Sequence, residues 1–425
     1  MRAVKWFLRI MLAAALVAVL TFAWASVDHC GEWRASPGGL IAMGRAVGPL
    51  QAGAAKVPFE LPYPVTLGGY GPWLREVDSA VEPLFARATV LQVGGQKFAL
   101  VSLETLLVSD SVVAAIREGR DFQVWVTATH SHTGPGNFDA RLVAEVAALG
   151  RHRADVESAI VSAAKKALDA AMGAQGPAVM TVSHDSHDLT HSRSDGEIDT
   201  DLDRVRFQTV AGLPIAQWLL FAGHPTMVSR ATTQLDGDYP SRVSKRFEAE
   251  GGVALVLQTA GGNATPNGPL EEFSAVLGDR FARLLEGSPE SEVALGVATS
   301  DVVLNHPDGQ RIAPSFLKPA VENALCASAL RHTEVSVLRL GSISFVAVPA
   351  EVTRPSAKVI LQQSSATVLL SLANGYQGYL ETDEAVRANT GEAHSQYFGP
   401  ELLTHIAEAA RNAGQAAGTF GAKAP

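Results

Sequence analysis

The feature that most constrains the fold of this chain is the alternation of short β-rich apolar runs with longer amphipathic segments. The apolar runs lie at 121–129, 178–183, 204–210, 215–222, 253–258, 343–349 and 366–372. Apolar residues recur at helical spacing in 156–172, 241–250, 271–287 and 400–414. Two further β-rich runs flank Gly94-Gly95 between Ala86 and Glu104, which predicts a hairpin. We therefore expect an α/β fold, with a mixed β-sheet core flanked by helices in one large domain.

Residues 31–80 depart from this pattern. They hold many glycines and prolines and show little periodicity. Such residues commonly interrupt regular elements. We expect irregular structure there that wraps around the body of the domain.

The N-terminus has the features of an export signal. Arg2, Lys5 and Arg9 precede an uncharged run of 18 residues from Ile10 to Val27. This run could be cleaved after Ala25 or could nearly span a bilayer as an anchor, and the residues leave both open. We assign residues 1–28 to a signal peptide or membrane anchor and residues 29–425 to one exported domain, periplasmic, extracellular or membrane-anchored.

Cys30 and Cys326 are the only cysteines of the chain. An exported domain faces an oxidising compartment, where the two could form a disulfide.

Polar side chains follow five of the expected strands. The segment TAGGNATPN follows one of them, and the other four are followed by His130 and His132, by His224, by Glu351, and by Tyr376 and Tyr379. Sheets of α/β proteins place their sites at the carboxyl ends of strands, so these groups could converge. If the strand before it stays extended, the His-x-His pair also points to one side. On its own, the His-x-His motif could consist of one histidine that caps a loop and one that lies in the core or at the surface. Polar groups that follow several different strands favour a metal site instead.

Imidazole, carboxylate and phenol ligands suit zinc. Zinc acidifies a bound water and polarises a carbonyl, which is the chemistry of amide and ester hydrolysis. A second histidine cluster, SHDSHDLTHSRSD with His184, His187 and His191, is interpreted as a polar loop.

These motifs together resemble the neutral or alkaline (non-lysosomal) ceramidase family, whose catalytic domain is a zinc amidase. The resemblance runs from about Ile41 to Pro400 and rests on ATHSHTGPG, HSRSD, FAGHPTM, DGDYPSRVSKRFE, VPAEVTRP and LANGYQGYLETDEA. It implies that Zn2+ is held by His130, His224, Glu351 and Tyr379. It further implies that His132 assists proton transfer and that Arg193 faces the substrate carbonyl.

The chain departs from the family pattern at two places within the motifs. The family's G-D-x-S-P-N loop reads Gly-Asn-Ala-Thr-Pro-Asn at 262–267, so Thr265 stands where the active serine would be and Asn263 replaces an aspartate. We keep Thr265 as a catalytic residue that orients water or substrate. A tyrosine expected twelve residues after Tyr379 falls on Gly391, and Tyr397 could supply the phenol instead. The sequence after the catalytic domain has no room for the family's C-terminal β-sandwich.

The resemblance implies a zinc-dependent amidohydrolase that cleaves the amide of an N-acylated lipid, ceramide first, at a membrane surface. An amidase or esterase for another acylated amine or lipid is the first alternative. A metal-holding lipid-binding domain with little catalysis is the second. The net charge of −9 and the lack of a basic block argue against a nucleic-acid partner. The residues do not predict an oligomeric state.

Overall fold

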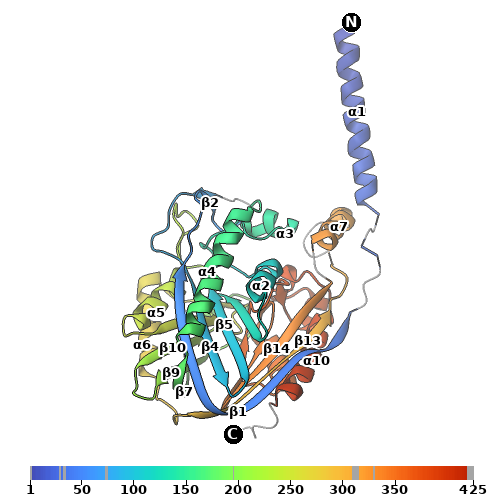
Figure 1. Cartoon of the computed structure of the whole chain (residues 1–425). Coiled ribbons are helices and arrows are strands. Elements are labelled where there is room, and N and C mark those ends of the chain that lie inside the picture. Colours follow the sequence, from blue (N-terminus) through green and yellow to red (C-terminus); the bar gives the residue numbers. More distant parts are fainter. Residues whose placement is uncertain are drawn as a thin grey trace.

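A computed structural model describes residues 2–27, 30–31, 35–71, 75–194, 196–308, 315–328 and 331–418. Its centre is a mixed sheet of twelve strands flanked by helices, in one domain (Figure 1). The main path of the sheet runs β11 (Val253–Gln258), β10 (Pro214–Phe221), β9 (Asp201–Thr209), β7 (Gly176–Ser186), β1 (Ser36–Pro58), β13 (Glu292–Val303), β14 (His332–Leu340), β15 (Ile343–Ala347) and β17 (Val368–Leu370). From β1 a branch continues through β4 (Phe85–Val93) and β5 (Gln96–Leu103) to β6 (Gln123–Ala128).

The α/β alternation expected from the sequence is confirmed. β4 and β5 form the hairpin around Gly94-Gly95, and β5–β6, β10–β11 and β15–β17 pair in parallel while the other main pairs are antiparallel. The sheet curls so that β11 contacts β4, β5 and β6. Trp125, Trp218 and Phe345 are fully buried in the core between these strands.

Helices cover the outer faces of the curled sheet. α2 (Asp110–Arg117) and α4 (Ala154–Gly173) pack over the β4–β6 branch, and α5 (Asp238–Glu248) and α6 (Leu270–Arg283) pack over β9 and β11. α8 (Arg354–Ser364) and α10 (Leu402–Ala417) cover β13, β14 and β15. Each helix turns an apolar face to the sheet, as the spacing of α4 shows with Val156, Ile160, Ala164 and Leu168 all buried.

The expectation of irregular structure over residues 31–80 is wrong for most of that region. β1 is a strand of 23 residues that pairs with β13 from Ser36 to Pro49 and with β4 from Leu50 to Pro58. Two of its glycines allow close packing: a Cβ on Gly38 would lie 2.4 Å from the carbonyl oxygen of Asp301, and one on Gly53 would lie 2.2 Å from that of Ala171. The glycine content therefore reflects close backbone approach within a strand.

Short elements connect these layers. They are β2 (Val65–Thr66), β3 (Glu76–Val77), α3 (Leu142–Ala144), η1 (Glu145–Leu149), β8 (Thr190–Ser192), β12 (Ala264–Pro266), η3 (Ser315–Leu317), α7 (Lys318–Ser328), β16 (Glu351–Val352), β18 (Tyr379–Leu380), α9 (Asp383–Ala388) and η4 (Ala393–Ser395). The histidine cluster interpreted as a polar loop lies partly in strands, since His184 belongs to β7 and His191 to β8. His187 is buried against the ring of Phe221.

The N-terminal segment forms α1 (Arg2–Ala25), which projects from the body (Figure 1). Its stretch Lys5–Ala25 is long and apolar enough to cross a membrane, a test that a cleaved signal sequence also passes. The expected boundary at Asp28 and His29 lies outside the described residues. Cys30 and Cys326 are joined in a disulfide, which confirms that they can pair.

Candidate metal centre

The two histidines of the His-x-His pair do meet, but not by strand alternation. β6 ends at Ala128, and the backbone at His130 turns into the left-handed region with a φ of 70°. The two rings then lie edge to face, with centroids 4.8 Å apart. The expectation of an extended end is therefore wrong, although its consequence holds. A left-handed non-glycine residue is strained, and such strain is concentrated at functional sites.

The three histidines of the centre share one hydrogen-bonding arrangement. Each Nδ1 faces a backbone carbonyl: His130 that of Leu106 at 2.7 Å, His132 that of Gly69 at 3.1 Å and His224 that of Gly261 at 2.9 Å. A carbonyl only accepts, so each Nδ1 carries the proton and each neutral ring offers its lone pair at Nε2. This is the outer arrangement typical of histidine ligands to a metal.

The three Nε2 atoms point at one another. The Nε2 of His130 lies 3.1 Å from that of His224 and 3.4 Å from that of His132. Burial lowers the pKa of His224 to about 4 and lowers the pKa of His132 well below its usual value. Lone pairs that face each other at this range repel, and a cation between them removes the repulsion. The trio could therefore hold a metal ion.

Glu351 completes a triangle with two of these nitrogens. Its Oε2 lies 3.0 Å from the Nε2 of His130 and 3.0 Å from that of His224, and it has no hydrogen-bond donor among the described residues. Two ligand atoms at zinc distances in a tetrahedron lie roughly 3.3 Å apart, so the three edges fit a zinc-sized ion. Burial alone would raise the pKa of Glu351, whereas positive charge on the side of His130 and His224 lowers it well below its usual range, so a cation among these atoms keeps the carboxylate ionised.

Tyr379 and Arg193 close the open side of this triangle. Glu351 and Tyr379 are directly opposite each other in the β16–β18 pair. The Tyr379 hydroxyl lies 3.0 Å from the Nε2 of His224 and accepts a hydrogen bond of 2.6 Å from Nη2 of Arg193. Burial, reinforced by the Glu351 carboxylate, raises the pKa of Tyr379 well above its usual value. Its oxygen therefore offers a lone pair beside a fixed positive charge.

The sequence assigned no specific role to two residues of the site. Tyr376 donates a hydrogen bond of 2.6 Å to Oε1 of Glu351, which fixes the carboxylate that carries the triangle. Glu392 accepts from Nε of Arg193 at 3.0 Å. Tyr376 lies three residues before Tyr379 in the same motif, so its position was a usable signal. No local signal marked Glu392, because its contact with Arg193 joins residues 199 positions apart in the sequence.

The loop after β11 supports the site through its backbone. The carbonyls of Gly261 and Gly262 accept from His224 and Arg193. The Nδ2 of Asn263 donates a hydrogen bond to the carbonyl of Glu197, away from the three histidines. Thr265 pairs with His191 in the β12–β8 ladder, and the hydrogen bonds among the described residues include none from its hydroxyl to the histidines. The catalytic role expected for Thr265 stays a prediction.

The backbone at Gly391, where the family's tyrosine is missing, favours glycine. Gly391 has a φ of +61°, and a Cβ there would lie 2.6 Å from Oε2 of Glu381. Tyr397, the expected substitute, packs its ring against Gly378. Burial and the Glu351 carboxylate raise the pKa of Tyr397 to about 12, so its hydroxyl is a neutral donor.

An apolar pocket that opens to solvent adjoins the centre. Its wall includes Leu106, whose carbonyl holds His130, and Tyr376, which holds Glu351. The rest of the wall is mainly apolar and comes from α3, η1, α7 and the segment of Tyr397 and Phe398. A hydrocarbon chain could lie in it with its polar end at the histidines.

Comparison with known proteins identifies the fold. No family model and no curated protein matches the chain by sequence. Among solved structures, the neutral ceramidase from Pseudomonas aeruginosa superposes with a TM-score of 0.73 at 16% identity, over 87% of this chain and 75% of that one. A structure described as ceramidase complexed with C2 superposes with a TM-score of 0.72 at 17% identity, over 86% and 75%. This chain therefore has the fold of the neutral ceramidases.

Proposed function

We propose that this protein is a metal-dependent hydrolase that cleaves the amide bond of an N-acylated lipid, with ceramide the first candidate and zinc the ion. The observation that carries the proposal is the triangle of His130, His224 and Glu351, whose three ligand atoms lie 3.0 to 3.1 Å from one another. Tyr379 would be the fourth ligand. The similarity to ceramidase structures supports the cleavage of an N-acylated lipid.

Different residues of the chain would have different roles in hydrolysis. When bound, zinc would supply a polarised carbonyl and a more acidic water. His132 is suited to accept a proton at Nε2, because its Nδ1 is committed to Gly69 and its low pKa keeps the ring neutral. Arg193 would stabilise negative charge on the carbonyl oxygen from its place beside Tyr379.

The adjoining pocket supports a lipid as the substrate. Its wall is mainly apolar, with Leu107, Ala147 and Phe398 among its residues, and Arg141 and Gln377 add polar groups. A chain of methylene groups gains about 0.8 kcal/mol for each group that leaves water. Such a pocket favours an acyl or sphingoid chain over a short polar amide. The altered loop at Asn263 and Thr265 leaves the head group open, so another acylated amine or lipid ester remains the second candidate substrate.

The test measures metal content and turnover on one preparation. The purified protein is assayed for bound zinc and for release of fatty acid from ceramide, from other N-acyl amines and from lipid esters. We expect about one zinc per chain and turnover of a long-chain amide. His187→Ala is the matched control, since it removes a buried histidine outside the centre. Bound zinc and lipid affinity without hydrolysis across the whole panel would replace the hydrolase with a lipid-binding domain.

A further inference from the structure

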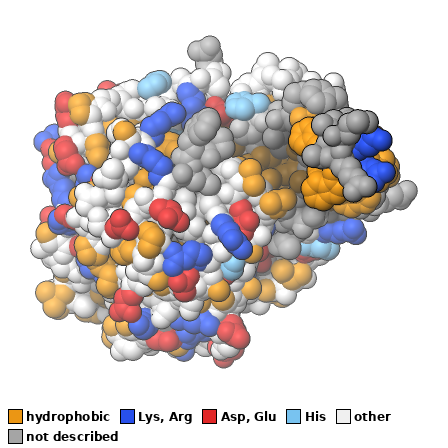
Figure 2. All heavy atoms as spheres, turned by 90° about the horizontal axis from the view of Figure 1, so that it is seen from above, with side chains coloured by type: hydrophobic (Ala, Val, Ile, Leu, Met, Phe, Trp, Pro, Cys, Tyr) orange, Lys and Arg blue, Asp and Glu red, His pale blue; other side chains and the backbone are white. Residues whose placement is uncertain are grey.

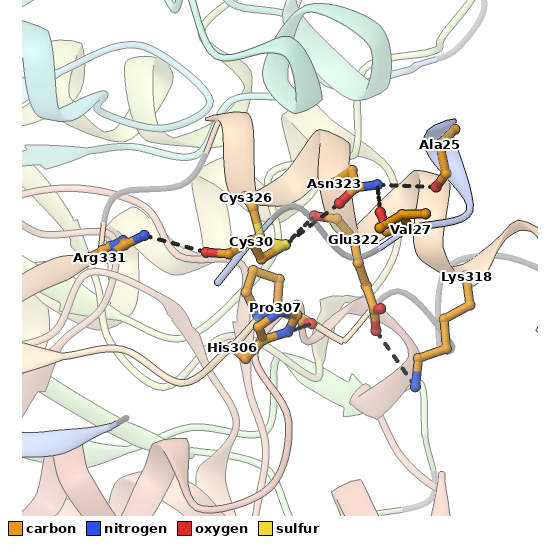
Figure 3. The surroundings of a disulfide bond; sticks show 10 residues. All are labelled: Ala25, Val27, Cys30, His306, Pro307, Lys318, Glu322, Asn323, Cys326 and Arg331. Atoms are coloured by element: carbon orange, nitrogen blue, oxygen red, sulfur yellow. Dashed lines mark hydrogen bonds and ion pairs between the residues drawn. A yellow bond between two sulfur atoms is a disulfide. The ribbon is translucent and has the colours of Figure 1, made fainter. Parts of the chain in front are cut away.

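The end of the apolar helix α1 is fastened to α7. Cys30 is joined to Cys326 of α7 by the disulfide (Figure 3). The Nδ2 of Asn323, also on α7, donates to the carbonyls of Ala25 at 3.0 Å and Val27 at 2.8 Å. Arg331 donates to the carbonyl of Cys30 at 3.3 Å. These contacts hold both sides of the point where α1 ends.

The same helix forms part of the apolar pocket. Leu325, the neighbour of Cys326, is buried and lines it. α7 also contacts α3, which with η1 supplies another part of the wall. The disulfide therefore connects the segment that follows α1 to a wall of the pocket.

The rim beside this wall exposes large apolar side chains. Leu142 of α3 is 49% exposed and Val146 of η1 is 61% exposed. They are four positions apart, so they lie on the same side of the helical segment. The neighbouring residues Val143, Ala144 and Ala147 line the pocket. An apolar rim next to an apolar pocket fits a lipid surface better than water.

The length of α1 places this rim near a bilayer. The 21 residues from Lys5 to Ala25 span about 31 Å as a helix, close to the ~30 Å hydrocarbon thickness of a membrane. If α1 spans the membrane, Ala25 lies at the surface and α7 lies directly beneath it. Figure 1 shows α1 leaving the body on the side that carries α3 and α7. Figure 2 looks down on this side and along α1, whose large hydrophobic side chains are exposed.

We propose that α1 is retained as a membrane anchor, and that the Cys30–Cys326 disulfide fixes the mouth of the pocket against the bilayer that holds it. Substrate lipid then enters the pocket from that same membrane. A retained α1 would leave the membrane at the wall of the pocket, because the carbonyl of Ala25, its last residue, is held by Asn323 of α7. The inference rests on the proposed function only for the identity of what enters, because the position of the rim does not depend on catalysis.

The first experiment measures position without using activity. The full chain with a cysteine at Val146 or, as the control, at Val210 is labelled with an environment-sensitive dye and reconstituted in phosphatidylcholine vesicles that contain nitroxide lipid. Val210 is 73% exposed on the turn before β10, at the end of that strand away from His224. We expect several-fold stronger quenching at 146 than at 210, and an intact N-terminus by mass spectrometry.

Equal quenching at the two positions would overturn the proposal, as would a purified protein that begins after Ala25. A label at 146 that is shielded in detergent in proportion to protein concentration would also overturn it, because a second copy of the chain would then cover the rim.

The second experiment tests the tether. Cys30→Ser with Cys326→Ser leaves α1 in the membrane but releases α7 from it, so quenching at 146 should fall at least twofold. Circular dichroism and the melting temperature report whether the released protein still folds. Should the double variant fail to fold, Asn323→Ala weakens the same attachment with the disulfide in place and should lower the quenching at 146 by a smaller factor. Unchanged quenching in a folded double variant would refute the role of the disulfide.

The third experiment tests the route of the lipid. Ceramide placed in the protein's own vesicles should be hydrolysed at least tenfold faster than ceramide in separate vesicles, and comparable rates would refute entry from the anchoring membrane. An absence of hydrolysis in both, with strong quenching at 146, would sink the proposed function and leave the docking geometry intact.

Discussion

The hydrogen bond from Tyr376 to Glu351 offers a direct test of the metal centre. Tyr376→Phe removes the donor 2.6 Å from Oε1 and leaves the ring in place. A hydrogen bond to a charged group contributes about 1.5–3 kcal/mol. Because Tyr376 is partly exposed in the pocket wall, the lower part of this range applies. About 1.5–2 kcal/mol corresponds to roughly 10- to 30-fold weaker metal binding.

The loss falls mainly on the metal-bound state. Without metal, the freed carboxylate of Glu351 can rotate or take up a proton, whereas a carboxylate that binds zinc must stay ionised and oriented. Outer partners of metal ligands commonly change metal affinity by about 10- to 100-fold, which agrees with this estimate.

The assay is competition for zinc with a chromogenic chelator, and turnover is then measured at saturating zinc. Tyr397→Phe is the matched control, because this phenol lines the same pocket while the described hydrogen bonds include none from its hydroxyl to Glu351. Metal affinity of Tyr376→Phe within twofold of the parent protein would refute the reasoning. A loss of turnover in Tyr397→Phe at full zinc occupancy would instead assign Tyr397 to the substrate oxygen.

Three other substitutions separate the roles in the site. His224→Ala should remove most bound metal and activity, and His187→Ala should retain both; full zinc occupancy in the first would exclude His224 as a ligand. Arg193→Gln should lower kcat by about 100- to 1000-fold if Arg193 stabilises the oxyanion, with zinc content unchanged, and an equal rise in KM with constant kcat would contradict that role. Gly391→Tyr should lower stability by about 1–3 kcal/mol, because its left-handed backbone disfavours a side chain, and a higher melting temperature with higher turnover would show that the position accepts a phenol.

Local sequence determined most of the elements and identified the candidate ligands. Runs such as 253–258 are strands because a short continuous segment of mainly valine, leucine and alanine is stable when both of its faces are buried, and β11 occupies that range. His130, His224 and Glu351 were identifiable because each follows a strand and strand ends meet at one edge of a sheet. These inferences need only neighbouring residues and a general rule of α/β topology.

Tertiary structure decided the rest. The sequence of the 23-residue strand β1 looks irregular because two of its glycines are required by close contact with the backbones of Asp301 and Ala171, which lie far along the chain. His130 points at its partners through a left-handed backbone that no side-chain alternation predicts. Whether Cys30 meets Cys326, and whether Glu392 meets Arg193, depends on distances between segments some 200 to 300 residues apart. Such contacts leave no local pattern, because each residue's own neighbours do not constrain what the fold brings against its side chain.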